Sequence, residues 1–149
     1  MYLKNLGHWY ILEQKAEESM KPTYLTPNTL ILGCHAADGT VAVLGTLRTL
    51  DCELVTGVLR LAGPLWATLG SALDEAATMD VDAVLVLTDV PALVKSLSRP
   101  FNADLASDDY WALLRRIGMA WAGRFRCEYV AKLPAATEFW AEEFGKVKV

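Results

Sequence analysis

Apolar positions along the chain follow two spacings, one typical of β-strands and one typical of α-helices. Short apolar or alternating runs, bounded by glycine, proline or aspartate, indicate five strands. These runs are Thr29–His35, Val41–Thr49, Glu53–Leu61, Ala83–Leu87 and Arg124–Lys132. Only short turns separate the first three, and the sequence Asp38-Gly39 is typical of a hairpin turn. The pattern therefore predicts an antiparallel meander at the start of the sheet.

Segments with helical spacing lie before, between and after these strands. They are Leu3–Met20, Pro64–Thr78, Pro91–Leu97, Asp108–Ala122 and Ala135–Phe144. Proline suits the first turn of a helix, and Ser107 is a good N-cap residue for the fourth segment. After the first helix, the predicted order is β-β-β-α-β-α-α-β-α. A meander followed by a crossover helix and a further strand predicts an α/β fold with a mixed five-stranded sheet.

The first helix stands apart from the rest of the chain. Lys21–Asn28 contains two prolines and is typical of an extended connection. We therefore expect an N-terminal helix with its linker over residues 1–28, and one domain over residues 29–149. The amphipathic first helix can pack on that domain or on a second subunit, and we expect a homodimer.

Composition argues against a membrane-spanning protein, a secreted protein and a fold held by disulfides or zinc. The 149 residues carry a net charge of −4, and no apolar run is long enough to span a bilayer. The N-terminus mixes charged with apolar residues and lacks the features of a signal peptide, so a cytoplasmic protein is expected. Three widely spaced cysteines, Cys34, Cys52 and Cys127, give no disulfide framework or zinc motif and are expected in the core.

One stretch, Val81–Leu97, places a carboxylate where α/β proteins bind ligands. Its apolar strand ends in Thr88-Asp89, and Pro91 then begins a helix. Asp89 is therefore expected at the carboxyl end of a buried strand. No glycine-rich phosphate loop, nucleophile elbow or HExxH motif occurs elsewhere in the chain.

The order of elements, together with three local sequences, resembles the ribonuclease H-like family over Thr29–Phe144. Leu87–Val90 is similar to the family's strand ending in T-D-S, and Ala72–Ala76 to its A-L-x-A-L segment. Pro134–Ala141 lies where the family carries N-x-x-A-D-x-L-A. Aligning the last alanine of that motif with Ala141 puts Glu138 at the acidic position.

The resemblance implies a nuclease that holds two divalent metal ions with up to four carboxylates. Asp89 matches the carboxylate of the fourth strand, and Glu138 matches that of the last helix. The first strand, Thr29–His35, contains no aspartate, and its nearest acid is Asp38 in the hairpin turn. The first helix of the domain begins Pro64–Thr68, without the expected glutamate.

We therefore expect a domain that acts by binding nucleic acid or a protein partner and lacks standard two-metal nuclease activity. No cofactor is expected in that case. A divergent nuclease is the alternative, with Asp89 and Glu138 as catalytic residues and ligands of Mg²⁺ or Mn²⁺, completed by Asp38 or His35. A structural or assembly subunit is the third possibility. Asp89 as a helix cap and Glu138 as an acid that complements a helix dipole remain open as purely structural roles.

Basic residues gather in the last third of the chain, among aromatic ones. The candidate nucleic-acid-binding residues are Arg115, Arg116, Arg124, Arg126 and Lys132. They could form a face that follows phosphates while Tyr110, Trp111, Trp121 and Phe125 stack on bases. The alternative is an ordinary solvated surface above aromatic residues that belong to the core.

Overall fold

Five β-strands form one sheet in the computed structural model, which describes residues 26–98 and 107–148. The strands are β1 (Thr29–Ala37), β2 (Thr40–Arg48), β3 (Leu54–Pro64), β4 (Ala83–Thr88) and β5 (Phe125–Tyr129). They lie side by side in the order β3-β2-β1-β4-β5. Strands β1, β2 and β3 pair antiparallel, whereas β4 runs parallel to both β1 and β5. The predicted mixed sheet is thus confirmed.

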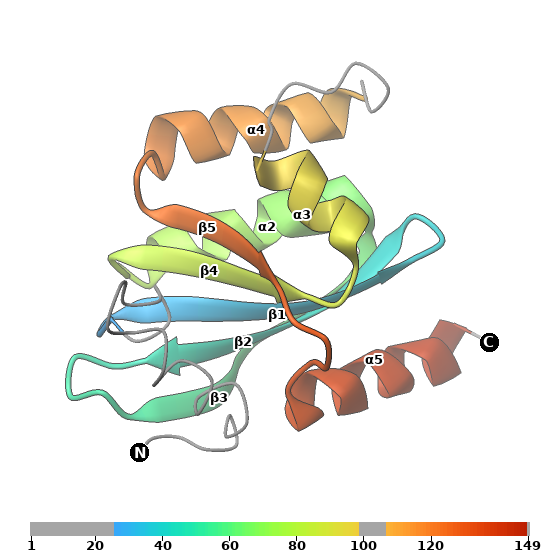
Figure 1. The fold of residues 1–149 in the computed structure, drawn as a ribbon, viewed down its shortest axis with the longest axis horizontal. Helices are drawn as coiled ribbons and strands as arrows, with labels where there is room; N and C mark the ends of the chain where they lie inside the picture. Colours follow the sequence, from blue (N-terminus) through green and yellow to red (C-terminus); the bar gives the residue numbers. More distant parts are fainter. Residues whose placement is uncertain (1–25, 99–106, 149) are drawn as a thin grey trace.

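Helices cover the sheet on both faces (Figure 1). They are α2 (Leu65–Thr78), α3 (Pro91–Ser98), α4 (Asp108–Ala120) and α5 (Ala135–Lys148). The buried residues of α2, α3 and α4 join a single core cluster on one face. Helix α5 lies on the opposite face, against β1, β2 and β3. The order of strands and helices in the described residues is the predicted one.

Several element boundaries differ from the prediction, most clearly those of β3, α2 and β5. Strand β3 continues to Pro64, and α2 begins one residue later at Leu65. Strand β5 ends at Tyr129, three residues before the predicted end. Its neighbour β4 stops at Thr88, whose carbonyl accepts a last hydrogen bond from the Val130 amide. The chain beyond Val130 has no strand to pair with, so it leaves the sheet.

The turn between β1 and β2 has the predicted geometry. Asp38 has φ of 53° and Gly39 has φ of 78°. Positive φ at both central residues is the signature of the hairpin turn that asparagine or aspartate followed by glycine favours. The Gly39 carbonyl also accepts a hydrogen bond from the Leu65 amide, which ties this turn to the start of α2.

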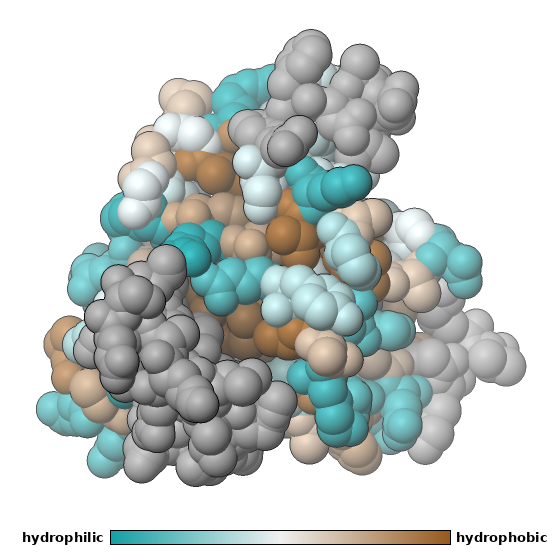
Figure 2. Space-filling model, viewed as in Figure 1, coloured by the Kyte–Doolittle hydropathy of each residue, from teal (hydrophilic) through white to brown (hydrophobic). Residues whose placement is uncertain are grey.

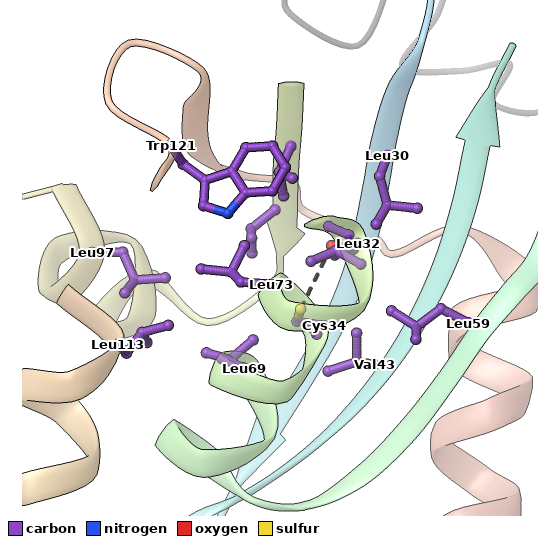
Figure 3. Close-up of a cluster of buried hydrophobic side chains, with 14 of the residues drawn as sticks. Leu30, Leu32, Cys34, Val43, Leu59, Leu69, Leu73, Leu97, Leu113 and Trp121 are labelled. Carbon is purple, nitrogen blue, oxygen red and sulfur yellow. Dashed lines mark hydrogen bonds between the residues drawn. The ribbon is translucent and has the colours of Figure 1, made fainter. Parts of the chain in front are cut away.

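The larger core lies between the sheet and α2, α3 and α4 (Figure 3). Leu32 and Cys34 of β1, Leu69 and Leu73 of α2 and Leu113 of α4 point toward one another there. The positions that face this core alternate along β1, because successive strand residues point to opposite faces.

Only part of the cysteine prediction is confirmed. Cys34 is fully buried, and Cys127 is half-buried against the same core. Cys52, in contrast, is exposed with φ of 66° in the turn between β2 and β3, so its prediction as a core residue is wrong. A turn residue has no sheet or helix face from which to reach a core.

A smaller apolar cluster lies on the other face of the sheet. Ile31, Leu85 and Leu87 are its buried members, with Leu54 and Val130 packed against them. Hydrophobic side chains are visible near the middle of this face in Figure 2, above α5. Both faces of the central strands are therefore apolar, which explains why β1 and β4 are continuous hydrophobic runs.

The predicted helix over Leu3–Met20 lies outside the described residues. The N-terminal unit and the homodimer accordingly stay predictions. Within the described ranges, helix length and apolarity fall short of what a membrane crossing requires.

Candidate functional site

A cleft opens at the carboxyl ends of β1 and β4, where α5 crosses the sheet. Its volume is about 350 Å³, within the size range of small-ligand sites. The residues that line it are His35, Asp89, Leu133, Glu138, Ala141 and Glu142. Both acidic residues predicted from the sequence as ligands, Asp89 and Glu138, therefore reach one cleft.

The register of two parallel strands brings His35 next to Asp89. Cys34 of β1 is paired with Thr88 of β4, so the residues that follow them are neighbours on the same face. His35 Nδ1 lies 3.5 Å from Asp89 Oδ1, and the two side chains are 44% and 29% exposed. Asp89 Oδ1 is buried, and it accepts no hydrogen bond from the described residues. The imidazole is thus the closest basic group to this carboxylate.

A glycine of β1 determines how closely α5 approaches the sheet. A Cβ atom on Gly33 would overlap the side chain of Thr137, which is buried on α5. Because Gly33 and His35 share one face of β1, this contact brings the next helix residue, Glu138, to the cleft. Glu138 Oε1 lies 3.3 Å from Lys132 Nζ. The second acid of the cleft therefore also has a basic partner.

The positions of the two acids can now be compared with the arrangement of the strands and helices. A three-stranded meander is followed by β4 parallel to β1, with α2 to α4 on one face and α5 on the other. Asp89 follows β4, the neighbour of the central strand β1, and Glu138 is carried by the last helix. The chain has a ribonuclease H-like fold.

Two of the solved structures that are similar to this chain are an RNase H1 and an RNase H domain. RNase H1 from the archaeon Halobacterium salinarum is 18% identical, with a TM-score of 0.49 over 76% of this chain and 92% of that one. The N-terminal RNase H domain of a Mycobacterium tuberculosis protein is 16% identical, with a TM-score of 0.48 over 76% of this chain and 94% of that one.

A third similar structure is part of a larger protein. A foamy viral protease-reverse transcriptase, solved in complex with double-stranded DNA, is 14% identical with a TM-score of 0.42. The match covers 90% of this chain and 27% of that one. No protein-family model matches the sequence, and neither does any curated protein.

The donor set of this ribonuclease H-like cleft fits a pair of magnesium ions poorly. Mg²⁺ takes oxygen ligands in octahedral geometry, and a two-metal site needs several carboxylates around ions about 4 Å apart. In the part of the chain that the structure describes, no three His, Cys, Asp or Glu side chains are grouped closely enough to hold a metal ion. The first turn of α2 carries no acid.

Asp38, the third predicted catalytic residue, lies beside the cleft and is absent from its lining. It borders a neighbouring hollow of about 180 Å³, at the turn between β1 and β2. His35 and Ala141 line both spaces, so the hollow adjoins the cleft. Asp89 lines the cleft, Asp38 lines the hollow, and His35 lies between the two as a lining residue of both.

The five basic residues predicted to contact nucleic acid do not form one surface. Arg116 of α4 donates to both carboxylate oxygens of Asp74 on α2, on the far side of the sheet from α5. Arg115 is exposed on the same helix. Arg124 precedes β5 and donates to backbone carbonyls, including that of Ala120 at the end of α4.

The other two basic residues lie near the cleft. Arg126 is paired in register with Leu85 and so faces the α5 side of the sheet. Its Nη2 atom lies 2.7 Å from Glu128 Oε2. Lys132 follows β5 and pairs with Glu138 at the cleft itself. Exposed ion pairs contribute little to stability, so phosphate groups can compete for these two side chains.

The aromatic residues near the basic ones belong mostly to the core. Tyr110 is fully buried, with its hydroxyl donating to the Ser96 carbonyl, and its ring packs 4.8 Å from that of Trp66. Trp121 is 3% exposed. These two rings are unavailable for stacking on bases, as the alternative interpretation expected.

Thiol chemistry is disfavoured in the core. Burial raises the pKa of Cys34, and burial together with the charge of Glu128 raises the pKa of Cys127 to about 12. Both thiols therefore stay protonated near neutral pH. Cys34 also points away from the neighbouring His35, as the alternation of a strand predicts.

Three features of the cleft were absent from the sequence-based prediction. Leu133 forms its buried wall, Gly33 admits α5, and Glu142 adds a further acid. Glu142 could have been found, because it follows Glu138 by four residues and so shares its helix face. Nothing in the sequence marks Gly33 in the same way, because its role depends on which helix packs over it in the fold.

Proposed function

We propose that this chain is a nucleic-acid-binding domain that does not hydrolyse by the standard two-metal mechanism. The observation that carries the proposal is the pairing of its two matched acids. Asp89 lies beside His35, and Glu138 lies beside Lys132. Two matched carboxylates, one of which is paired with a cationic lysine, offer less negative charge for two divalent cations than four convergent carboxylates do.

The nucleic acid is expected on the α5 side of the sheet. Arg126 on β5 and Lys132 at the rim of the cleft are two basic residues that lie there. Phosphate contacts supply most non-specific affinity for nucleic acids, and they do so by releasing counterions. The proposed path therefore runs along β5 and past the cleft.

The test is to measure binding by fluorescence anisotropy at several salt concentrations. Labelled RNA, DNA, an RNA–DNA hybrid and a four-way junction are the probes, each in Mg²⁺ and in Mn²⁺. We expect binding that weakens steeply with salt, without cleavage. Lys132→Ala and Arg126→Ala should each weaken binding several-fold and reduce the slope of log K against log salt by about 1.

Arg116→Ala is the matched control, because it removes the same charge from the opposite side of the sheet. An equal loss with this variant would place the nucleic acid elsewhere on the molecule. No binding of any probe at moderate salt would overturn the proposal.

A divergent metal-dependent nuclease is the second candidate. The observation in its favour is that Asp89 and Glu138 line one cleft and that Asp89 Oδ1 is buried without a hydrogen bond from the described residues. Metal-dependent cleavage that disappears in Asp89→Asn would establish this function in place of the first. Under the first proposal, Asp89→Asn leaves binding intact, because it removes a negative charge beside the phosphate path.

A further inference from the structure

A second hollow, of about 270 Å³, lies between α5 and β3. Among the described residues, none lines both this hollow and the cleft that contains Asp89. Its lining residues are Leu44, Thr56, Gly57, Arg60, Ala136, Phe139, Trp140 and Glu143. The hollow therefore has a basic residue and two aromatic residues at its surface.

A bulge in β3 creates one side of this hollow. The partners of β2 jump from Leu59 to Thr56, which leaves Gly57 and Val58 without a partner in the ladder. Gly57 has φ of 85°, a conformation that glycine adopts readily. Arg60 folds back over this bulge, since a Cβ on Gly57 would lie 3.7 Å from its Nη2 atom. The Arg60 guanidinium group thus lies over the bulge, and Arg60 is one of the residues that line the hollow.

Helix α5 supplies the other side with two neighbouring rings. Trp140 Nε1 donates a hydrogen bond of 3.0 Å to the Leu61 carbonyl of β3, which fixes the indole in place. The next ring, that of Phe139, is 63% exposed although it is a large apolar side chain. The exposed ring of Phe139, the fixed indole of Trp140 and Arg60 therefore line one hollow at the border of α5 and β3.

We propose that this hollow, the Arg60–Phe139 platform, binds an unpaired base of single-stranded nucleic acid. Phe139 stacks on the face of the base, and Arg60 contacts the adjoining phosphate. Stacking on an aromatic side chain is available to every base, and the planar guanidinium suits phosphate geometry. Glu143 also lines the hollow. An uncharged base face suits the aromatic side and a single phosphate suits Arg60.

The inference rests on the proposed function, because it adds a subsite for the same class of ligand. It also adds a preference for single-stranded over double-stranded nucleic acid, which the phosphate contacts of Arg126 and Lys132 do not give. Bases in a duplex have both faces covered by stacking, so only a single strand can use the platform. The protein is therefore expected to bind a single strand more tightly than a duplex of the same length.

The experiment compares variants of the full chain with a labelled single-stranded oligouridine and a duplex RNA of equal length. Phe139→Ala should weaken single-strand binding about tenfold, as expected for the loss of one stacked base, and leave duplex binding unchanged. Phe139→Tyr should retain the affinity, because it keeps the ring. Arg60→Ala should weaken binding and lower the salt slope by about 1.

Met119→Ala is the control, since Met119 is 81% exposed on α4, away from α5. A single strand carrying 2-aminopurine gives a direct measure of stacking, because its fluorescence is quenched when the base stacks. We expect quenching with the wild-type chain and with Phe139→Tyr, and none with Phe139→Ala.

The outcomes separate this inference from the proposed function. Unchanged single-strand affinity and quenching in Phe139→Ala would overturn the inference and leave the proposed function standing. A wild-type chain that binds neither probe would overturn both. Equal loss of single-strand and duplex binding in Phe139→Ala would also overturn the inference, because it would show that the residue does not contact an unpaired base.

Discussion

At the scale of single residues, the site depends on a position without a side chain. Gly33 lies under α5, and any Cβ atom there would meet the side chain of Thr137. Thr137 is itself buried, so it has no solvent into which to move. The distance between β1 and α5, and with it the position of Glu138, follows from this one contact.

Replacing Gly33 by alanine should destabilise the fold by about 1–3 kcal/mol, the usual cost of overpacking a core. Because α5 must shift, nucleic-acid affinity should change as well. Denaturant unfolding followed by circular dichroism measures the first effect, and anisotropy measures the second.

The chain offers a matched control for this substitution. Gly118 lies within α4, and a Cβ atom added there would have no described atom within 4 Å outside its own helix turn. Gly118→Ala should leave stability unchanged or raise it by up to about 1 kcal/mol, because alanine is the better helix former. Equal effects of the two substitutions would contradict the role assigned to Gly33.

At the scale of elements, helix α4 joins the two other helices on its side of the sheet. Its N-cap is Ser107, whose Oγ accepts a hydrogen bond of 3.1 Å from the Tyr110 amide. Tyr110 then reaches α3 through the Ser96 carbonyl and α2 through the ring of Trp66. The start of α4 is therefore linked to the packing of all three helices.

Removing the cap in Ser107→Ala should cost about 1 kcal/mol of unfolding free energy, the usual effect of losing such a hydrogen bond. Ser107→Asp should restore most of the loss, since a carboxylate accepts the same bond and complements the helix dipole. Urea unfolding of the two variants provides the comparison. A cost in Ser107→Asp as large as that in Ser107→Ala would argue against capping.

At the scale of the whole molecule, the buried thiols make the free energy of unfolding depend on pH in the alkaline range. Burial raises the pKa of Cys34 and raises that of Cys127 to about 12, above the ordinary value near 9. Between these values the unfolded chain loses thiol protons that the folded chain keeps. The free energy of unfolding must therefore fall as pH rises above about 9.

Each buried thiol contributes at most about 1.4 kcal/mol per pH unit to this fall. Cys127→Ala should reduce the slope of unfolding free energy against pH between about 9 and 12. Cys52→Ala, which changes an exposed residue, should not. Urea titrations across this range measure the slope, and an unchanged slope in Cys127→Ala would show that this thiol is not protected by the fold.

Much of the fold follows from local patterns that are visible in the sequence. The apolar run of β4, the Asp38-Gly39 turn and the Ser107 cap each specify one element from neighbouring residues. The predicted ends of β3 and β5 were wrong, because a strand ends where its partner ends and that partner is remote in sequence. The prediction for Cys52 was wrong for a related reason. Cysteine is usually buried, but Cys52 lies in a turn between two strands and is exposed there.

The candidate site was only partly accessible from the sequence. Asp89 could be placed at the end of a strand, and the resemblance aligned Glu138 with an acidic position. That each acid has a basic neighbour could not be foreseen. The His35–Asp89 contact needs the β1–β4 register, and the Lys132–Glu138 contact needs the turn between β5 and α5.

By itself, the sequence determined the order and type of the elements and the carboxylate at the end of β4, because hydrophobic spacing and turn chemistry act over a few residues. Only the tertiary structure decided which side chains share a space. It paired Asp89 with His35, brought Glu138 to the same cleft, and placed Arg60 and Phe139 on the lining of one hollow. These contacts join residues far apart in the chain, and only strand register and helix packing bring such residues together.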